Sequence, residues 1–254
     1  MIKNTLSLAL TLSVLLVGFF SSSSGQEVPQ RVITHVTGDF YRAQNNNHNS
    51  AFLVTPEGII VVDPLNEDFA EWLKQELDER FGVPVRYVLY SHHHWDHASG
   101  GAVFEDTAQF VGHANMLTHL AMPPDSTTLS DVIGQYAPVA ALDTNANGQI
   151  EPSEAAGNDT DAPFSAFDAN GDGLLSGAEV LRGPLSQVRP PTITYQNKLE
   201  ITLGGKRAIL EWVGEMNHSL DMSRIIFPEE SVMMVVDYIT FGRLPYRELD
   251  YELG

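Results

Sequence analysis

The feature that most constrains this chain is the run SHHHWDH at residues 91–97, which directly follows the apolar segment 83–90. The apolar segment predicts a strand, so four histidines and one aspartate are presented at a rigid strand end. Imidazole and carboxylate groups are ligands that zinc, iron and manganese accept. Four imidazoles within six residues are hard to bury without a metal, because every ring nitrogen needs a partner. The run therefore predicts a metal site.

The spacing within this run, H-x-H-x-D-H, indicates two metal positions rather than one. In an extended loop alternate residues point the same way, so His92 and His94 are expected to grip one ion. Asp96 and His97 then turn toward a second position a few ångströms away. Two metals about 3.5–4 Å apart can share a hydroxide and clamp a substrate oxygen. This chemistry is typical of hydrolysis.

The rest of the chain alternates predicted strands and helices. Strands are predicted at 31–42, 50–54, 58–63, 107–111, 192–195, 198–203, 207–213, 222–227 and 231–236. Helices are predicted at 66–81, 98–104 and 113–121. Gly204-Gly205 predicts a tight hairpin turn between two of the later strands. Strand, helix, strand, helix in this order predicts an α/β layered domain.

The first 25 residues have the pattern of a secretory signal. Lys3 gives the positive start, residues 6–20 the apolar core, and the serines at 21–24 the cleavage region. The core is shorter than the roughly 20 apolar residues of a bilayer span, so we expect a periplasmic or secreted protein without stable membrane insertion after cleavage. The chain has no cysteine, so metal ligands must come from His, Asp, Glu or main-chain oxygens.

The net charge of −19 is concentrated in one stretch. Between residues 122 and 181 there are ten carboxylates and no lysine or arginine. Such a segment either stays solvated or binds cations. A nucleic-acid partner is not expected, because no basic surface is available to neutralise phosphates.

Residues 122–191, rich in Asp, Asn, Gly, Ala and Pro, are interpreted as an insertion that binds calcium. Two stretches, 143–154 and 168–179, fit the 12-residue loop of an EF-hand, with oxygen ligands at positions 1, 3, 5 and 7, glycine at 6 and glutamate at 12. The predicted ligands are Asp143, Asn145, Asn147, Gln149, Glu154, Asp168, Asn170, Asp172, Leu174 and Glu179, with main-chain carbonyls at Gln149 and Leu174. Ile150 and Leu175, at position 8, are expected to pair the loops. Only thirteen residues separate the loops, too few for two full helices, so abbreviated helices or a dockerin-like arrangement are expected there.

The segment 91–101, SHHHWDHASGG, resembles the metallo-β-lactamase superfamily, and strand 58–63 is similar to that family's entry strand. The resemblance covers about 31–121 and 192–240. It implies an αββα sandwich, formed by residues 26–121 and 192–254, with a binuclear metal site at the edge of two sheets.

The resemblance also implies roles for individual residues. His92, His94 and His218 would bind the first metal, Asp96 and His97 the second, and Asp237 would bridge both. The expected metals are two zinc ions, with iron or manganese as alternatives. Asp63 is expected to support the loop rather than bind metal. His93 is expected at the mouth or beside the ligands, and His113 and His119 as ordinary helix-start and helix-face residues, whereas His35 and His48 give no signal.

The family's last ligand is a histidine downstream of the bridging acid, and no histidine follows His218. We therefore expect a sequence that is truncated at its C-terminus. The expected function is secreted metal-dependent hydrolysis of an ester, lactone or amide bond in a small molecule, with a metal-bound hydroxide as nucleophile and Asp96 as the catalytic acid or base. The alternative is a non-catalytic calcium-binding interaction module on an incomplete metal scaffold.

Overall fold

The fold was analysed in a computed structural model, which describes residues 29–158, 162–215 and 217–239. The predicted signal at 1–25 and the end of the chain at 240–254 lie outside the described residues. No helix among the described residues is long and apolar enough to cross a membrane.

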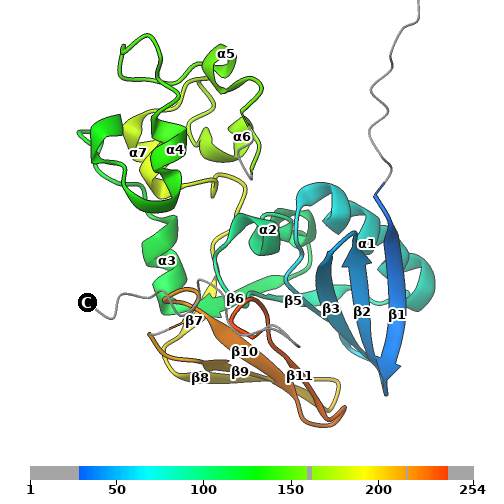
Figure 1. The fold of residues 1–254 in the computed structure, drawn as a ribbon. Helices are drawn as coiled ribbons and strands as arrows, with labels where there is room; N and C mark the ends of the chain where they lie inside the picture. Colours follow the sequence, from blue (N-terminus) through cyan, green and yellow to red (C-terminus); the bar gives the residue numbers. More distant parts are fainter. Residues whose placement is uncertain (1–28, 159–161, 216, 240–254) are drawn as a thin grey trace, which may run out of the picture.

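A seven-stranded mixed sheet forms the first half of the fold (Figure 1). Its strands, adjacent in chain order, are β1 (Arg31–Thr37), β2 (Phe40–Asn45), β3 (His48–Thr55), β4 (Gly58–Val62), β5 (Val85–Leu89), β6 (Gln109–His113) and β7 (Ile193–Tyr195). The first four strands pair antiparallel, and β4 to β7 pair parallel. The predicted strand at 31–42 is in fact a hairpin, because the chain turns at residues 38–39, where Gly38 has a left-handed φ of 52°.

A second, antiparallel sheet packs against the first. Its four strands, in the order β11-β10-β9-β8, are β8 (Lys198–Leu203), β9 (Lys206–Trp212), β10 (Ser223–Phe227) and β11 (Val232–Met234). The predicted turn at Gly204-Gly205 joins β8 to β9, with positive φ at both glycines. This agrees with a two-residue hairpin loop, which needs residues that adopt φ > 0.

Alternate residues of the central strands point into two separate cores. Phe52, Ile59 and Val61 face the helix layer, whereas Leu53 and Ile60 face the second sheet, all of them fully buried. This follows from the two-residue repeat of a strand. A strand that is apolar on both faces is expected between two layers, which explains why β4 reads as one continuous β-branched run.

The helix layer on the outer face of the first sheet comprises α1 (Glu67–Phe81), α2 (Trp95–Ala98), the 3₁₀ turn η1 (Gly101–Phe104) and α3 (Ala114–Leu120). The Asn66 side chain accepts the Phe69 amide to start α1, and Gly82 ends it in the left-handed conformation. The layered α/β fold is therefore confirmed. Among the described residues the layers are helix, sheet and sheet, without an outer helix on the second sheet.

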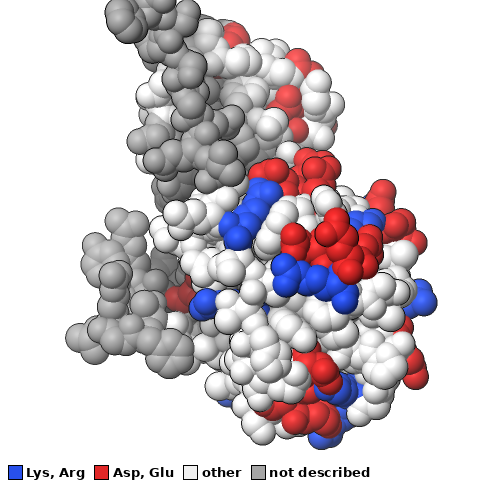
Figure 2. Space-filling model, turned by 90° about the vertical axis from the view of Figure 1, so that its right-hand side faces the viewer, with Lys and Arg blue, Asp and Glu red and all other residues white. Residues whose placement is uncertain are grey.

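Short elements with a core of their own occupy the stretch predicted as an insertion. They are η2 (Leu129–Asp131), η3 (Gly134–Tyr136), α4 (Ala137–Ala140), α5 (Pro152–Ala155), α6 (Phe164–Phe167) and α7 (Gly177–Arg182). In Figure 1 they project away from both sheets, above α3. Figure 2 shows acidic side chains on this upper part of the molecule, whereas the lower part carries both signs.

Candidate metal centre

The predicted metal ligands meet at one edge of the first sheet. Asp63 directly follows β4 and Ser91 is the second residue after β5, so both lie where these parallel strands end at their carboxyl edge. His218 comes from the loop between β9 and β10, and Asp237 follows β11. The helix predicted at 98–104 is instead two short elements: α2 already contains Asp96 and His97 and ends at Ala98, and the 3₁₀ turn η1 follows from Gly101.

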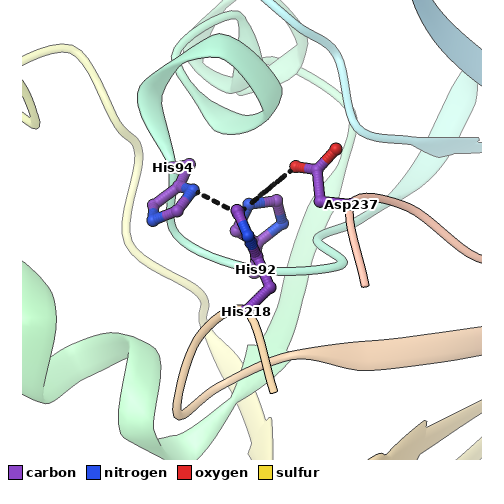
Figure 3. A group of neighbouring side chains, drawn as sticks. All are labelled: His92, His94, His218 and Asp237. Atoms are coloured by element: carbon purple, nitrogen blue, oxygen red, sulfur yellow. Dashed lines mark hydrogen bonds and ion pairs between the residues drawn. The ribbon is translucent and has the colours of Figure 1, made fainter. Parts of the chain in front are cut away.

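Four of the six predicted ligands form one compact group: His92, His94, His218 and Asp237 (Figure 3). His94 Nδ1 lies 2.9 Å from His218 Nε2. Asp237 Oδ2 lies 3.4 Å from His92 Nε2 and 3.5 Å from His218 Nε2. Ligands of a tetrahedral zinc ion, bound at 2.0–2.1 Å, are about 3.3 Å apart, so the spacing of this group fits such an ion.

A hydrogen-bond relay leaves one nitrogen of His92 free. Ser91 donates its hydroxyl to Asp63 Oδ2 at 2.7 Å, so it accepts from His92 Nδ1 at 2.9 Å. His92 Nε2 then carries a lone pair. It is buried and has no hydrogen-bond partner among the described residues, while the Asp237 carboxylate faces it. A lone pair facing a carboxylate needs a cation between them, so the residues fit a divalent metal.

The other two predicted ligands lie beside this group. His97 Nε2 is 3.0 Å from Asp237 Oδ2 and 3.7 Å from Asp96 Oδ2, so Asp237 lies between both sets of residues. Asp63 contacts His97 Nδ1 at 3.3 Å and accepts the Ser91 amide at 2.8 Å. Asp63 thus contacts both ends of the 91–97 segment, as a loop-supporting residue is expected to do. Asp63 and Asp237 both have left-handed φ, of 49° and 58°, a strain that concentrates at functional sites.

His48, for which the sequence gives no signal, also lies at this site. Its Nε2 is 3.4 Å from Asp96 Oδ2, and its ring centroid is 6.4 Å from that of His97. The position follows from topology: β3 runs antiparallel to β4, so the start of β3 lies at the edge where β4 ends. His48 is 44 residues upstream of His92, and no local pattern connects them.

A second group, His93, His119 and Asp221, was also missed by sequence reasoning. Asp221 is 1% exposed and accepts from His93 at 2.9 Å and from Ser219 at 2.8 Å. The three side chains are close enough to hold a metal. However, the rings of His93 and His119 stack in parallel, 3.9 Å apart and 5° from coplanar, so their in-plane lone pairs do not converge on one ion. We interpret the His93–Asp221 contact as a link between the loops that carry His94 and His218.

Burial and charge determine the protonation of the ligands. Burial lowers the pKa of His92 well below its usual value and that of His94 to about 3, so both rings are neutral and able to bind metal at pH 7. Burial opposes ionisation of Asp96, but its hydrogen bond with His48 and the charges of His97 and His94 lower the pKa of Asp96 to about 2. Burial also opposes protonation of His97, yet hydrogen bonds to Asp237 and Asp63 raise its pKa well above the usual value.

The two predicted calcium loops have matching conformations. Asp143 accepts the Gly148 amide at 2.9 Å, and Asp168 accepts the Gly173 amide at 3.0 Å. The expected contact between position-8 residues is present: Ile150 and Leu175 exchange two main-chain hydrogen bonds of 3.0 Å. The other predicted ligand side chains line the same two loops, where Asn145, Asn147, Asn170, Asp172, Glu154 and Glu179 accept loop amides.

Comparison with known proteins places this geometry in a family. The model of the metallo-beta-lactamase superfamily matches residues 44–235. No curated protein matches the sequence. Among solved structures, a Cronobacter sakazakii metallo-beta-lactamase with an HARLDQ motif has a TM-score of 0.50 and 13% identity over 86% of this chain and 67% of its own.

Two further structures give similar values. The FEZ-1 metallo-beta-lactamase from Legionella gormanii has a TM-score of 0.48 and 14% identity over 79% of this chain, which spans 59% of that enzyme. The metallo-beta-lactamase from Pontibacter korlensis has a TM-score of 0.48 and 13% identity over 80% of this chain and 70% of its own. Since the family model covers most of the sequence, from β2 to β11, the chain belongs to the metallo-beta-lactamase superfamily.

Proposed function

We propose that the chain is a secreted zinc-dependent hydrolase that cleaves an ester, lactone or amide bond in a small molecule. The observation that carries the proposal is the buried lone pair of His92 Nε2, which faces the Asp237 carboxylate at 3.4 Å. The imidazole nitrogen and the carboxylate are both acceptors, and neither has a proton to donate to the other. Such a pair forms a preformed cation site. Family membership supports metal-dependent hydrolysis. Export is supported only by the composition of residues 1–25.

In this proposal three histidines hold the first ion, namely His92, His94 and His218. Asp96 and His97 hold the second, and Asp237 lies between the two positions. When bound, divalent ions supply Lewis acidity and lower the pKa of a water molecule.

The surrounding side chains orient these groups. Ser91 and Asp63 fix the tautomer of His92, and Asp63 also restrains His97. Asp96, ionised at neutral pH, accepts a hydrogen bond from the attacking water and takes its proton. Asp96 then passes this proton to the leaving group.

Metal removal and return test the catalytic proposal. The chelator-treated protein is expected to be inactive, and two equivalents of zinc should restore hydrolysis of p-nitrophenyl acetate and a γ-lactone. A β-lactam serves as the comparison substrate, and metal content is measured by elemental analysis. A folded protein that retains no zinc and hydrolyses none of these substrates would support the non-catalytic alternative instead.

His48 is expected to contribute to the second metal position. Because its Nε2 lies at ligand-like distance from Asp96, His48→Ala should weaken zinc binding at that position by about 10–100-fold, as loss of a ligand-orienting group does. Zinc affinity is measured by competition with a chromophoric chelator. His35→Ala is the matched control, since His35 lies on β1 and contacts Gly38 instead. Equal affinities in wild type and His48→Ala would rule out this contribution.

We further propose that residues 143–154 and 168–179 bind calcium. The support comes from the two 12-residue patterns and from the reciprocal Ile150–Leu175 hydrogen bonds, which join the loops as paired calcium loops are joined. Glycines at position 6, Gly148 and Gly173, have φ of 88° and 81°, as the sharp loop turn requires. Calcium in this position stabilises the insertion and takes no part in the chemistry.

A further inference from the structure

A cleft of about 710 Å³ lies between the metal centre and the insertion. One side of it is formed by His48, His94 and Asp96. The other side is formed by residues 135–142 of the insertion together with Phe167. A volume of this size suits a small organic ligand rather than a single ion or a macromolecule. A compound bound in this cleft therefore contacts two of the six candidate metal ligands, His94 and Asp96.

The insertion side of the cleft is mostly apolar, with Gln135 and Asn158 as its polar residues, and packing within the insertion supports it. Tyr136, Val139, Leu142 and Phe167 line it, and the Tyr136 and Phe167 rings pack edge to face with centroids 5.6 Å apart. Gly183, at the end of α7, lies so close to the Tyr136 ring that a Cβ there would be 2.5 Å from it. The wall is thus fixed to the helix that closes the second predicted calcium loop.

Trp95 connects this wall to the metal centre. It lies in the sequence between His94 and Asp96, and it packs both against the core under the first sheet and against the core of the insertion. Its side chain also lines the cleft. The floor of the cleft and the metal-binding run are therefore a single continuous segment.

No charged side chain among the described residues lines the insertion side of the cleft. Among the described residues that line the cleft there is no lysine or arginine, and its two histidines and its one carboxylate, His48, His94 and Asp96, all lie on the metal side. An anionic group on the wall side of a ligand would find no positive side chain there, whereas an uncharged apolar group would be buried against aromatic and aliphatic residues.

We propose that the insertion forms the substrate-binding wall, and that the cleft takes uncharged acyl compounds with an aromatic or aliphatic group. That the bound compound is a substrate rests on the proposed hydrolase function, whereas the preference for uncharged ligands follows from the residues of the wall. Tyr136 and Leu142 determine the preference for uncharged ligands. The Tyr136 ring provides contact area for an apolar group, and Leu142 places an uncharged side chain in the wall.

A pair of fluorescent probes tests this preference without catalysis. N-phenyl-1-naphthylamine is uncharged, and 1-anilinonaphthalene-8-sulfonate has the same rings with one negative charge. The zinc-loaded full chain is expected to bind the uncharged probe at least tenfold more tightly. Tyr136→Ala should weaken that binding by about tenfold, whereas Leu142→Lys should raise affinity for the sulfonate by about tenfold. Ile133→Ala is the matched control, because Ile133 is an insertion residue that is 78% exposed and does not line the cleft.

Equal binding of both probes, or unchanged affinity in Tyr136→Ala together with Leu142→Lys, would overturn the inference. Zinc content is measured for every variant and should not change. Hydrolysis of p-nitrophenyl acetate and p-nitrophenyl octanoate is measured separately, and Tyr136→Ala should lower kcat/KM only for the octanoate. If neither ester is hydrolysed, the proposed hydrolase function fails while the probe result still decides whether the wall selects uncharged ligands.

Discussion

His94→Ala is expected to abolish hydrolysis and to lower zinc content in the same sample. His94 Nδ1 lies 2.9 Å from His218 Nε2, so removing the ring leaves the first position with two of its three imidazoles. Loss of metal removes several kcal/mol of transition-state stabilisation, which corresponds to a decrease in kcat of about 10³-fold or more. Steady-state kinetics and elemental analysis measure the two effects. His94 lies in the loop after β5 and belongs to neither hydrophobic core of the two sheets, so the variant is expected to fold.

Two further variants separate a metal effect from a folding effect. Asp237→Asn keeps the shape of the side chain but removes the charge that faces His92 and His97, so zinc affinity should fall while the thermal midpoint changes little. His35→Ala should leave both activity and zinc content at wild-type levels. A folded His92→Ala/His94→Ala double variant that retained full zinc would contradict the assignment of the first metal position.

The sequence was sufficient for the parts of the site whose residues are neighbours in the chain. His92, His94, Asp96 and His97 share one strand end, and such a pattern has few interpretations besides a metal site. The strands were predicted for the same reason, because the two-residue repeat and continuous apolar runs are local signals. His218 and Asp237 needed the family resemblance, since each is a single residue after an apolar segment. The structure brings both of them to His92.

The missed residues depend on long-range packing. His48 reaches Asp96 only because β3 and β4 pair with Ala51 opposite Val62. Asp221 reads in the sequence as one surface acid among many, and only the fold buries it beside His93. Neither contact has a pattern in the chain, because strand register and loop packing are set by the whole core. The apolar wall was hidden for the same reason, within a segment that composition describes only as acidic and polar.

Glu179→Gln is expected to remove most of the stabilisation that calcium gives to the insertion. Glu179 is 2% exposed and occupies position 12 of the second loop, where a bidentate carboxylate is needed for calcium. For a dissociation constant of about 10⁻⁴ M, about 10 mM calcium should stabilise the wild type by about 2.7 kcal/mol. That amounts to a rise of roughly 5–10 °C in the thermal midpoint for a chain of this size. Calorimetry with and without calcium measures the difference.

The test compares the rise in thermal midpoint that calcium causes in each variant, not the thermal midpoint itself. Glu179 also accepts hydrogen bonds from the Ala169 and Ser176 amides, so its replacement destabilises the loop even without calcium. Asp125→Asn is the control, because Asp125 is an exposed acid of the same segment outside both loops, and it should keep the full increment. Limited proteolysis gives a local readout: calcium should protect residues 140–180 in wild type and Asp125→Asn, but not in Glu179→Gln. If the rate of cleavage in the wild type were the same with and without calcium, the two loops would not bind calcium. The insertion would then be stabilised only by its own core around Ile150 and Leu175.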